Sequence, residues 1–399
     1  MADTNDSVSY APEKLIERAR SLAPVLRSRA SETSKARHIP RETIADFWSA
    51  HLFHLLKPAK FGGPEVRVDD AFTVAGELAR GDGSAAWVWT VMGVHDLFVA
   101  LFPEKAQEEY WADPHRLSAS SFAPSGKAVP APGGYTLNGK WSFCSGVDHA
   151  DWMILGAIFG MISTDPPIPD FRFVLLPKSD LKAVIDDWHV MGLCGTGSKT
   201  VVVENLFIPE HRVASNADMM QGKAPGAAVH AGGIYRTPVW ALFPFCISSP
   251  AVGIARGAFE AFVDEMKSRS AHIGHAPLAK MPNIQMRVSE AGALIDAAGL
   301  LYQRSLRETI DLATAGKPLP VEFRIRNRRD QGYAIRMAKQ ATEILLSAQG
   351  GMGLFEHHPV QRAFRDLQAV SAHLVGGWDM PAINYGSVTL GGQPTDFFW

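Results

Sequence analysis

The sequence predicts a mainly helical α+β protein in which a domain of short strands lies between two helical domains. Apolar residues recur every three or four positions before about residue 111 and again after about residue 233, which is the period of a helix with one buried face. Between these regions the pattern changes to short segments rich in β-branched and aromatic residues, separated by Gly, Pro, Asn or Asp. We therefore expect three domains, over residues 1–114, 115–220 and 221–399.

The N-terminal domain is expected to contain four helices. Over residues 11–36 the apolar residues share one helical face. A second helix follows Pro40, because proline is favourable near the start of a helix. Residues 68–102 contain two more, and one of them is apolar nearly all round. Such a helix is expected to be deeply buried.

The central domain is expected to be a small antiparallel barrel or sandwich. Its predicted strands lie in five segments, YTLNGKWSFCSG, DWMILGAIF, FRFVLLP, AVIDDWHVMG and KTVVVENLFIP. Helices return after the Gly- and Ala-containing segment 221–233. From Arg328 to Gly350, a stripe of small residues on one helical face permits close contact with another helix, either inside one subunit or between subunits.

The composition excludes several classes of protein. With 39 Lys and Arg against 41 Asp and Glu, the net charge is −2, which offers no basic surface for nucleic acid or anionic lipid. No apolar run reaches the roughly 20 residues that span a bilayer, and the polar, acidic start MADTNDSVSY differs from a signal peptide. Three widely spaced cysteines without CxxC spacing favour a reducing compartment. We therefore expect a cytoplasmic protein without disulfides.

Common nucleotide, metal and hydrolase motifs are absent or misplaced. GTGSKT, residues 195–200, precedes a strand, and QGGMG, residues 349–353, follows a helix. Neither therefore lies between a strand and a helix, as a dinucleotide-binding loop requires. His357 and His358 have no carboxylate and histidine partners at metal-ligand spacing, so no metal site is expected. The lack of a GxSxG elbow argues against a Ser-His-Asp hydrolase.

Two segments have both a functional and a structural interpretation. In WSFCSGVDHADW, Ser145 stands at the end of a strand before Gly146, where a small hydroxyl has room beside a flat ligand. An ordinary strand edge explains the same pattern. In RDLQAVSAHLVGGW, His373 stands on an apolar helical face, where a lone histidine is more often a buried structural residue than a catalytic group. The residues alone leave both alternatives open.

Three segments together resemble the acyl-CoA dehydrogenase superfamily. LNGKWSFCSGVDHADW is similar to its pattern of Leu-Asn-Gly, Lys, an aromatic residue and a Ser or Thr that touches flavin. MGLCGTGSKTVVVENLFIPEHRV resembles its Gly-x-Arg-Gly-x-Ser strand, with Cys194 where Arg is common. QGGMGLFEHHPVQRAFRD resembles its Gly-Gly-x-Gly and Arg-Asp segment. The resemblance covers nearly the whole chain and implies an N-terminal helical domain, a central β-barrel or sandwich and a C-terminal four-helix bundle.

One position distinguishes the subfamilies. Many acyl-CoA dehydrogenases place a catalytic Glu about eight residues after the Arg-Asp pair, where this chain has Leu374, and leucine cannot take a proton. No Asp or Glu stands between Asp366 and Asp379. The chain is more similar to the two-component flavin-dependent monooxygenases of this fold, which include hydroxylases of 4-hydroxyphenylacetate and of the phenolic steroid intermediate 3-HSA, and indole oxygenases. An acyl-CoA dehydrogenase or a nitroalkane-oxidase-like flavoenzyme is the alternative.

This resemblance implies an oxygenase that receives reduced FMN or FAD from a separate flavin reductase. Addition of O₂ to the reduced flavin gives a C4a-hydroperoxide, whose distal oxygen is transferred to an electron-rich phenol or indole ring in a site that excludes water. The implied partners are therefore a small aromatic substrate, O₂ and the reductase. The fold normally assembles as a homotetramer, a dimer of dimers.

The resemblance also assigns roles to single residues. Ser145 matches the position that contacts flavin N5, and His373 matches the histidine that faces the substrate, where an imidazole can accept or share the phenol proton. His95 and Ser121 match positions that hold substrate, with the choice between Ser120 and Ser121 left open. The remaining matches place residues against the flavin, namely Trp141, Phe143, Gly195, Thr196, Ser198, Gly350 and Gly351, with Arg269 near its phosphate end.

Overall fold

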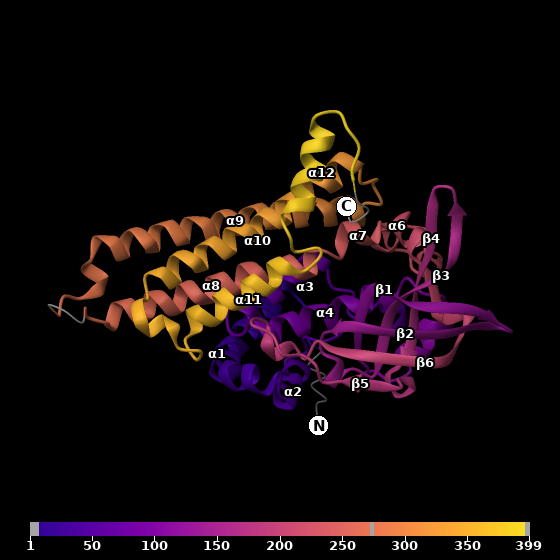
Figure 1. Ribbon diagram of the computed structural model, residues 1–399, viewed down its shortest axis with the longest axis horizontal. Helices are drawn as coiled ribbons and strands as arrows, with labels where there is room; N and C mark the ends of the chain where they lie inside the picture. The colour runs from indigo at the N-terminus through magenta and orange to yellow at the C-terminus, as the bar shows by residue number, and fades with distance from the viewer. Residues whose placement is uncertain (1–7, 272–274, 396–399) are drawn as a thin grey trace, which may run out of the picture.

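The N-terminal part of the chain folds into five helices in the computed structural model, which describes residues 8–271 and 275–395 (Figure 1). They are α1 (Pro12–Ala36), α2 (Arg41–Ser49), α3 (Val68–Ala79), α4 (Gly83–Val99) and α5 (Glu104–Trp111). Helix α1 starts with proline and buries the apolar face that the sequence predicts. The sequence predicts four helices here, and α5 is the additional one.

Helix α4 is the helix that the sequence predicts to be deeply buried, and it carries two residues of the candidate site, Trp87 and His95. All but one of its positions are buried, because it packs against α3, α8 and β1. The carboxylate of Asp82 caps its start and accepts a hydrogen bond from Ser84 N at 3.3 Å. Its two site residues therefore have little freedom to move.

Seven strands form one sheet in the described part of the chain, in the order β5-β6-β2-β1-β3-β4-β7. They are β1 (Ser118–Ala131), β2 (Gly134–Cys144), β3 (Trp152–Thr164), β4 (Pro167–Pro177), β5 (Ala183–Ile185), β6 (Lys199–Pro209) and β7 (Val213–Ser215). The sequence predicts antiparallel strands, but β1 and β3 pair in parallel. The difference arises because β1 and β2 form a hairpin, after which the chain crosses β1 and β3 joins its other edge.

Trp141 belongs to the core of this sheet. Its side chain has no exposed surface, and its Nε1 donates a hydrogen bond to Gly156 O at 2.7 Å. A Cβ atom on Gly126 or Gly139 would lie only 2.2 or 2.5 Å from the indole ring, so both glycines make room for it. The prediction that Trp141 borders the flavin is therefore wrong, because the ring has no face left for a ligand.

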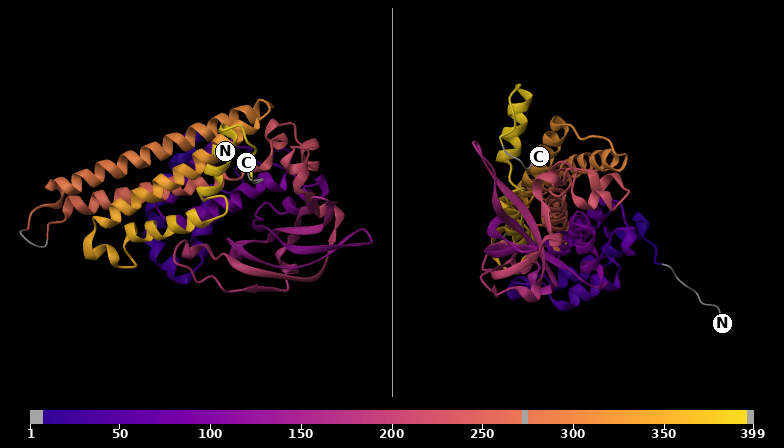
Figure 2. Two further views of the ribbon diagram at one scale, coloured as in Figure 1. Left: turned by 45° about the horizontal axis from the view of Figure 1, so that its top comes forward. Right: turned by 90° about the vertical axis from the view of Figure 1, so that its right-hand side faces the viewer.

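The C-terminal part is the predicted four-helix bundle. It consists of α8 (Phe245–Ser268), α9 (Pro282–Thr314), α10 (Val321–Ser347) and α11 (Pro359–Ala372), preceded by the short helices α6 (Asn216–Met220) and α7 (Val239–Leu242). The bundle extends away from the sheet, and α12 (Asp379–Thr389) projects from it (Figure 2). The predicted domain boundaries at 114/115 and 220/221 fall between elements, and the division into domains stays a prediction.

The stripe of small residues on α10 lies inside the bundle. Ala334, Ala338 and Ala341 have no exposed surface, and α10 packs against α8, α9 and α11. Packing within one subunit therefore explains the stripe. One stretch of the described chain, Val239–Ser268, is long and apolar enough to cross a membrane by length and composition, but 89% of its most apolar window is buried inside the protein.

Candidate active site

A cluster of hydroxyl groups lies where β2 ends, and it contains three of the residues predicted to contact flavin. Ser145 Oγ lies 2.7 Å from Ser198 Oγ, which lies 2.7 Å from Thr196 Oγ1. Trp87 Nε1 donates a hydrogen bond to Ser145 Oγ at 3.2 Å. Thr196 and Ser198 are buried, whereas Ser145 is half-buried. Ser145 is therefore the hydroxyl of this cluster that a ligand can reach.

The turn that carries Thr196 and Ser198 is held by bonds to two other segments. Gly146 N, just after β2, donates to Thr196 O at 2.9 Å. Gly195 N donates to Ser84 Oγ, at the start of α4, at 3.1 Å. The turn thus joins the strand that carries Ser145 to the helix that carries Trp87. The hydroxyl cluster is positioned before any ligand binds.

Phe143 holds its ring out into solvent beside this cluster. Its φ of 66° lies in the left-handed region, where a bulky residue is uncommon, and 70% of the residue is exposed. The ring of Trp188 packs against it edge-on, with centroids 6.0 Å apart. An exposed aromatic ring next to neutral hydroxyl groups fits a flat heterocycle with polar edge atoms. These residues therefore fit the flavin that the resemblance implies.

His373 caps the C-terminal end of α11 and faces Trp87, with ring centroids 5.6 Å apart. The side chain is exposed to solvent, yet the surrounding protein and the positive charge of Arg328 lower the pKa of His373 to about 4. His373 is therefore neutral at physiological pH and accessible to a ligand.

Hydrogen bonding assigns the tautomer of His373. Val375 N donates to His373 Nδ1 at 3.3 Å. The neutral imidazole has one donor and one acceptor nitrogen, so its proton is on Nε2. His373 consequently presents a hydrogen-bond donor, and not a base, to a ligand beside Trp87.

His95 has the opposite tautomer. Its Nδ1 lies 2.9 Å from the carbonyl oxygen of Ser118, which only accepts hydrogen bonds, so Nδ1 carries the proton. Its Nε2 then accepts from Ser120 Oγ at 2.9 Å. His95 has no exposed surface, and burial lowers its pKa to about 4. The lone pair of a neutral imidazole is therefore directed at Ser120.

The alternation of β1 decides which of two adjacent serines meets His95. Successive side chains of a strand point to opposite faces, and Ser118 and Ser120, two residues apart, both contact His95. Ser121 Oγ instead donates to Ser142 O at 2.8 Å. The structure thus brings Ser120, rather than the predicted Ser121, to His95.

A cluster of aromatic rings adjoins His95. The ring of Phe122 lies 6.1 Å from the imidazole and stacks on Phe98 at 4.6 Å. Phe243 and Phe173 pack against it at 4.8 and 5.2 Å. Aromatic rings prefer such offset and edge-on contacts with one another. Phe122 is half-buried and the other three rings are buried, so they give His95 an apolar surrounding.

We expect the free energy of unfolding to fall as the pH drops from about 6.5 to about 4. In the unfolded chain His95 takes up a proton near its ordinary pKa of 6.5, whereas in the folded protein it does so only near 4. The unfolded state thus binds more protons in this range, and the loss is on the order of 3 kcal/mol once both states are protonated. Urea unfolding of the wild type and of His95→Gln at several pH values measures it. Equal pH slopes in the two proteins would contradict the expectation.

Gly350 and Gly351 lie apart from the hydroxyl cluster. They belong to a short 3-10 turn, Gly350–Leu354, that leads into the N-terminal end of α11, whereas His373 caps its C-terminal end. A helix of 14 residues is about 21 Å long. Arg269 Nη1 donates to Gln349 O at 3.2 Å, which places it beside the same turn. The structure therefore does not bring these three residues to Ser145 in one chain.

The cysteines are all free thiols. Cys144 and Cys246 have no exposed surface, and Cys194 is half-buried in the turn before Thr196. Within the described residues, no group of three His, Cys, Asp or Glu side chains is arranged to hold a metal ion. Cys194 is thus the thiol that a reagent in solution reaches first.

Comparison with known proteins identifies the family. Residues 13–115 match the N-terminal domain of acyl-CoA dehydrogenases, and residues 245–377 match their C-terminal domain. The chain belongs to the acyl-CoA dehydrogenase family. The family and the fold that the sequence predicts are thereby confirmed.

Similar members of the acyl-CoA dehydrogenase family are oxygenases. The oxygenase component of the FADH(2)-dependent resorcinol hydroxylase of Rhizobium sp. is 35% identical, over 98% of this chain and 99% of its own. The crystal structure of 3-HSA hydroxylase from Rhodococcus sp. superposes with a TM-score of 0.91 at 35% identity, over 97% of this chain and 99% of its own. XiaF from Streptomyces sp., in complex with FADH2 and glycerol, has a TM-score of 0.87 at 28% identity, over 96% of this chain and 97% of its own.

Sequence reasoning missed one residue that the structure places in the site, Trp87, and left a second, Ser120, as an open alternative to Ser121. Trp87 bridges Ser145 and His373, but the run AAWVWTV predicts only a buried helix, and both tryptophans fit that interpretation. Ser120 bonds His95, and the signal for it was the spacing of two from Ser118 on one strand. That signal required knowing that His95 faces β1.

Proposed function

We propose that this chain is the oxygenase component of a two-component flavin-dependent monooxygenase, and that it hydroxylates a phenolic ring held between His95 and His373. The observation that carries the proposal is the pair of opposite tautomers, one histidine accepting a proton and the other donating a hydrogen bond, beside the hydroxyl cluster of Ser145. Trp87 and His95 are eight residues apart on α4, about 12 Å, a span that suits one aromatic ring beside the edge of a flavin.

Reduced flavin, when bound, supplies the electrons that activate O₂ for transfer of one oxygen atom to the ring. Ser145 holds the polar edge of the cofactor by a neutral hydrogen bond, with Ser198 and Thr196 fixing the orientation of its hydroxyl. Phe143 supplies an aromatic surface for its ring system. These contacts need no charged side chain, so they support a cofactor that binds and leaves as a diffusing partner of a separate reductase.

The chain prepares the substrate by moving one proton. A phenol hydroxyl bound at Ser120 donates a hydrogen bond to Ser120 Oγ, whose own proton is held by His95 Nε2. As oxygen is transferred to the ring, the phenol becomes more acidic, and its proton passes to Ser120 while the Ser120 proton passes to His95. Negative charge on the phenol oxygen then flows into the ring during the transfer. His373, beside Trp87, would hold a polar atom of the cofactor or substrate by donating a hydrogen bond from Nε2. Resorcinol, named for the Rhizobium relative, is a phenol of the expected kind.

Thioester dehydrogenation is the alternative chemistry of this fold, and one feature of the site disfavours it. The position where that reaction needs a carboxylate is Leu374, whose side chain is 69% exposed beside His373. His373 itself offers a donor at its free nitrogen. Removal of a carbon-bound proton requires a base at that place, and neither residue supplies one.

The experiment is an anaerobic titration with reduced FMN and reduced FAD, followed by oxygen pulses with resorcinol, other phenols and an indole. We expect tight binding of reduced flavin, weak binding of oxidised flavin, and hydroxylated product in proportion to the O₂ consumed. A reaction without protein and one with catalase measure the product formed by free peroxide. Bleaching of a tightly bound yellow flavin by an acyl thioester would contradict the proposal.

Replacing His373 with Ala is expected to lower the yield of product per O₂ by about tenfold, because a lost donor to a charge-bearing oxygen costs on this order. Oxygen that is not transferred then appears as H₂O₂, which a peroxidase assay measures beside the product. His373→Gln is the matched control, since its amide retains an N–H donor, and we expect it to recover part of the yield. A yield in His373→Ala equal to that of the wild type would remove this role.

We also propose that the chain forms a homotetramer in the cytoplasm. The turn that contains Gly350 and Gly351 and the neighbouring Arg269 lie at the opposite end of α11 from His373. Their match to flavin-binding positions is then best explained if they serve the flavin of another subunit. Light scattering of the purified protein measures the assembly.

A further inference from the structure

Arg365 and Asp366 lie within α11, the helix that His373 caps, but the proposed mechanism does not use them. Asp366 lies on α11, seven residues before His373, which is two helical turns. Its side chain is only 4% exposed, and burial raises the pKa of this carboxyl, while Leu193 N and the arginines at 362 and 365 oppose the shift. A buried carboxylate costs free energy unless it is well bonded, so its contacts matter.

Both residues bond to the chain just before the turn of Thr196 and Ser198. Asp366 Oδ1 accepts a hydrogen bond from Leu193 N at 2.6 Å, and Arg365 Nη1 donates to Met191 O at 2.7 Å. Between these two bonds lies Gly192, where a Cβ atom would stand 1.9 Å from Arg365 O. Only glycine permits so close an approach of the turn to α11.

The segment that these two bonds hold is irregular. Residues 187–198 belong to no strand, and Leu193 has a φ of 52°, in the left-handed region that favours glycine. Such a conformation persists only when its surroundings impose it. The bond to Asp366 holds the amide of this same residue. Three residues further on stands Thr196, which belongs to the hydroxyl cluster.

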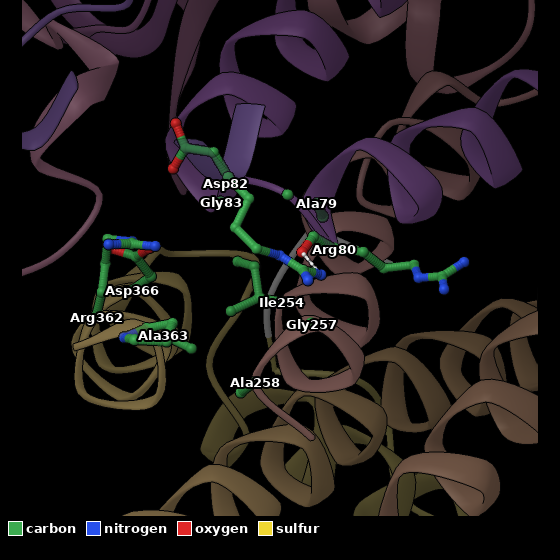
Figure 3. A pocket seen from close by; sticks show the side chains of 13 residues that line it. Ala79, Arg80, Asp82, Gly83, Ile254, Gly257, Ala258, Arg362, Ala363 and Asp366 are labelled. Atoms are coloured by element: carbon green, nitrogen blue, oxygen red, sulfur yellow. Dashed lines mark hydrogen bonds between the residues drawn. The ribbon is translucent and has the colours of Figure 1, made fainter. Parts of the chain in front are cut away.

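Asp366 also lies against the start of α4. A Cβ atom on Gly83 would stand 2.9 Å from Asp366 Oδ2, and Gly83 is the first residue of α4. Figure 3 shows Asp366 beside Arg362 on α11, with Asp82, Gly83 and Ile254 around the same small pocket. The amides at a helix start favour negative charge nearby. Asp366, on α11 itself, thus contacts both the segment before Thr196 and the start of α4.

We propose that Asp366 and Arg365 are positioning residues that fix the turn of Thr196 and Ser198 and the start of α4 against α11, and so set the spacing between Ser145 and His373. This inference rests on the proposed function for its effect on product yield. The hydrogen bonds between Asp366 and Leu193 N and between Arg365 and Met191 O, however, are present in the protein without flavin. Loss of these hydrogen bonds makes the turn mobile, and more of the O₂ consumed then appears as H₂O₂ instead of product.

The first test needs no flavin. It uses the thiol of Cys194, which lies in the turn Cys194–Thr196, directly after Leu193. We expect Asp366→Ala to speed the labelling of Cys194 by an aromatic disulfide reagent by about tenfold, because the lost bond is one to a charged group. Gly192→Ala should have the same effect through a clash and without a change of charge. Peptide mapping assigns the label, since Cys144 and Cys246 are buried.

The second test measures product formed per O₂ with reduced flavin. We expect a loss of about tenfold in Asp366→Ala and in Gly192→Ala, because a small displacement of a positioned group costs this much or more. Asp366→Asn should restore most of the yield, since its amide oxygen still accepts from Leu193 N. Arg365→Lys should lose less than Arg365→Ala.

Asp330→Asn is the matched control for a general loss of stability. Asp330 is a fully buried carboxylate in the bundle, bonded to Arg304 and Ser305 and away from the turn. We expect it to lower the melting temperature without faster labelling of Cys194 or lower yield. Unchanged labelling in Asp366→Ala, or equal labelling in Asp330→Asn, would overturn the inference. If the wild type hydroxylates no phenol, the proposed function is contradicted. The labelling result would still test whether Asp366 and Arg365 position the turn.

Discussion

Replacing His95 with Asn is expected to lower the rate of aromatic hydroxylation by at least about 100-fold, the usual contribution of a positioned general base. The amide nitrogen of Asn occupies nearly the place of imidazole Nδ1 and keeps the bond to Ser118 O, but nothing replaces Nε2. The variant therefore loses the proton acceptor and keeps the anchor. Rapid-mixing kinetics with a phenol substrate and reduced flavin measure the rate.

His95→Gln is the comparison that separates proton transfer from hydrogen bonding. Its amide oxygen reaches toward Ser120 as an acceptor, but it cannot take a proton at neutral pH. We expect it to bind substrate nearly as well as the wild type and to hydroxylate as poorly as His95→Asn. Both variants should bind reduced flavin normally, because Ser145 and Ser198 are intact. If His95→Gln hydroxylates at the wild-type rate, then His95 only holds the substrate.

Replacing Trp141 with Ala is expected to lower the free energy of unfolding by about 3–5 kcal/mol, as for other fully buried aromatic residues. The indole is completely buried and packs directly on Gly126 and Gly139, whose missing side chains leave space that no neighbour can fill. The change also leaves Gly156 O without the hydrogen bond from the indole. Urea unfolding followed by circular dichroism measures the loss.

Phe143→Ala is the matched control, because Phe143 lies two residues away on the same strand with its ring in solvent. We expect almost no loss of stability in this variant. For the affinity for reduced flavin we expect the opposite order. Phe143→Ala should bind reduced flavin more weakly than the wild type. Trp141→Ala, measured at a low temperature at which it is folded, should bind it as the wild type does. Weaker flavin binding with unchanged stability in Trp141→Ala would restore the original prediction for that residue.

The sequence predicts the fold well because its signals are periodic. A helical period before residue 111 and after residue 233, with short strands between, is visible in any window of a few turns. The resemblance then locates Ser145, Thr196 and Ser198, which the structure brings within hydrogen-bonding distance of one another. Each of them stands next to a glycine or at a strand end, where the chain must turn.

The directions in which single side chains point could not be predicted from the sequence, because they depend on contacts between distant segments. Trp141 and Phe143 stand two positions apart, so a regular strand would put both rings on one face. The irregular register between Trp141 and Cys144 and the positive φ of Phe143 separate them, and the packing of Gly126 and Gly139 shows that Trp141 is the buried ring. Likewise, only the position of α4 shows that Ser120 faces His95. The proton positions on the histidines were hidden for the same reason. The sequence suggests His373 as the base, and the amide of Val375 reverses that interpretation.

The exposed ring of Phe143 has a thermodynamic consequence. A flavin that covers this ring removes two apolar surfaces from water at once, and such burial carries a negative change in heat capacity. The enthalpy of association then becomes more favourable as the temperature rises, while the entropy becomes less so. These two changes oppose each other, so the affinity for flavin varies less with temperature than either contribution does.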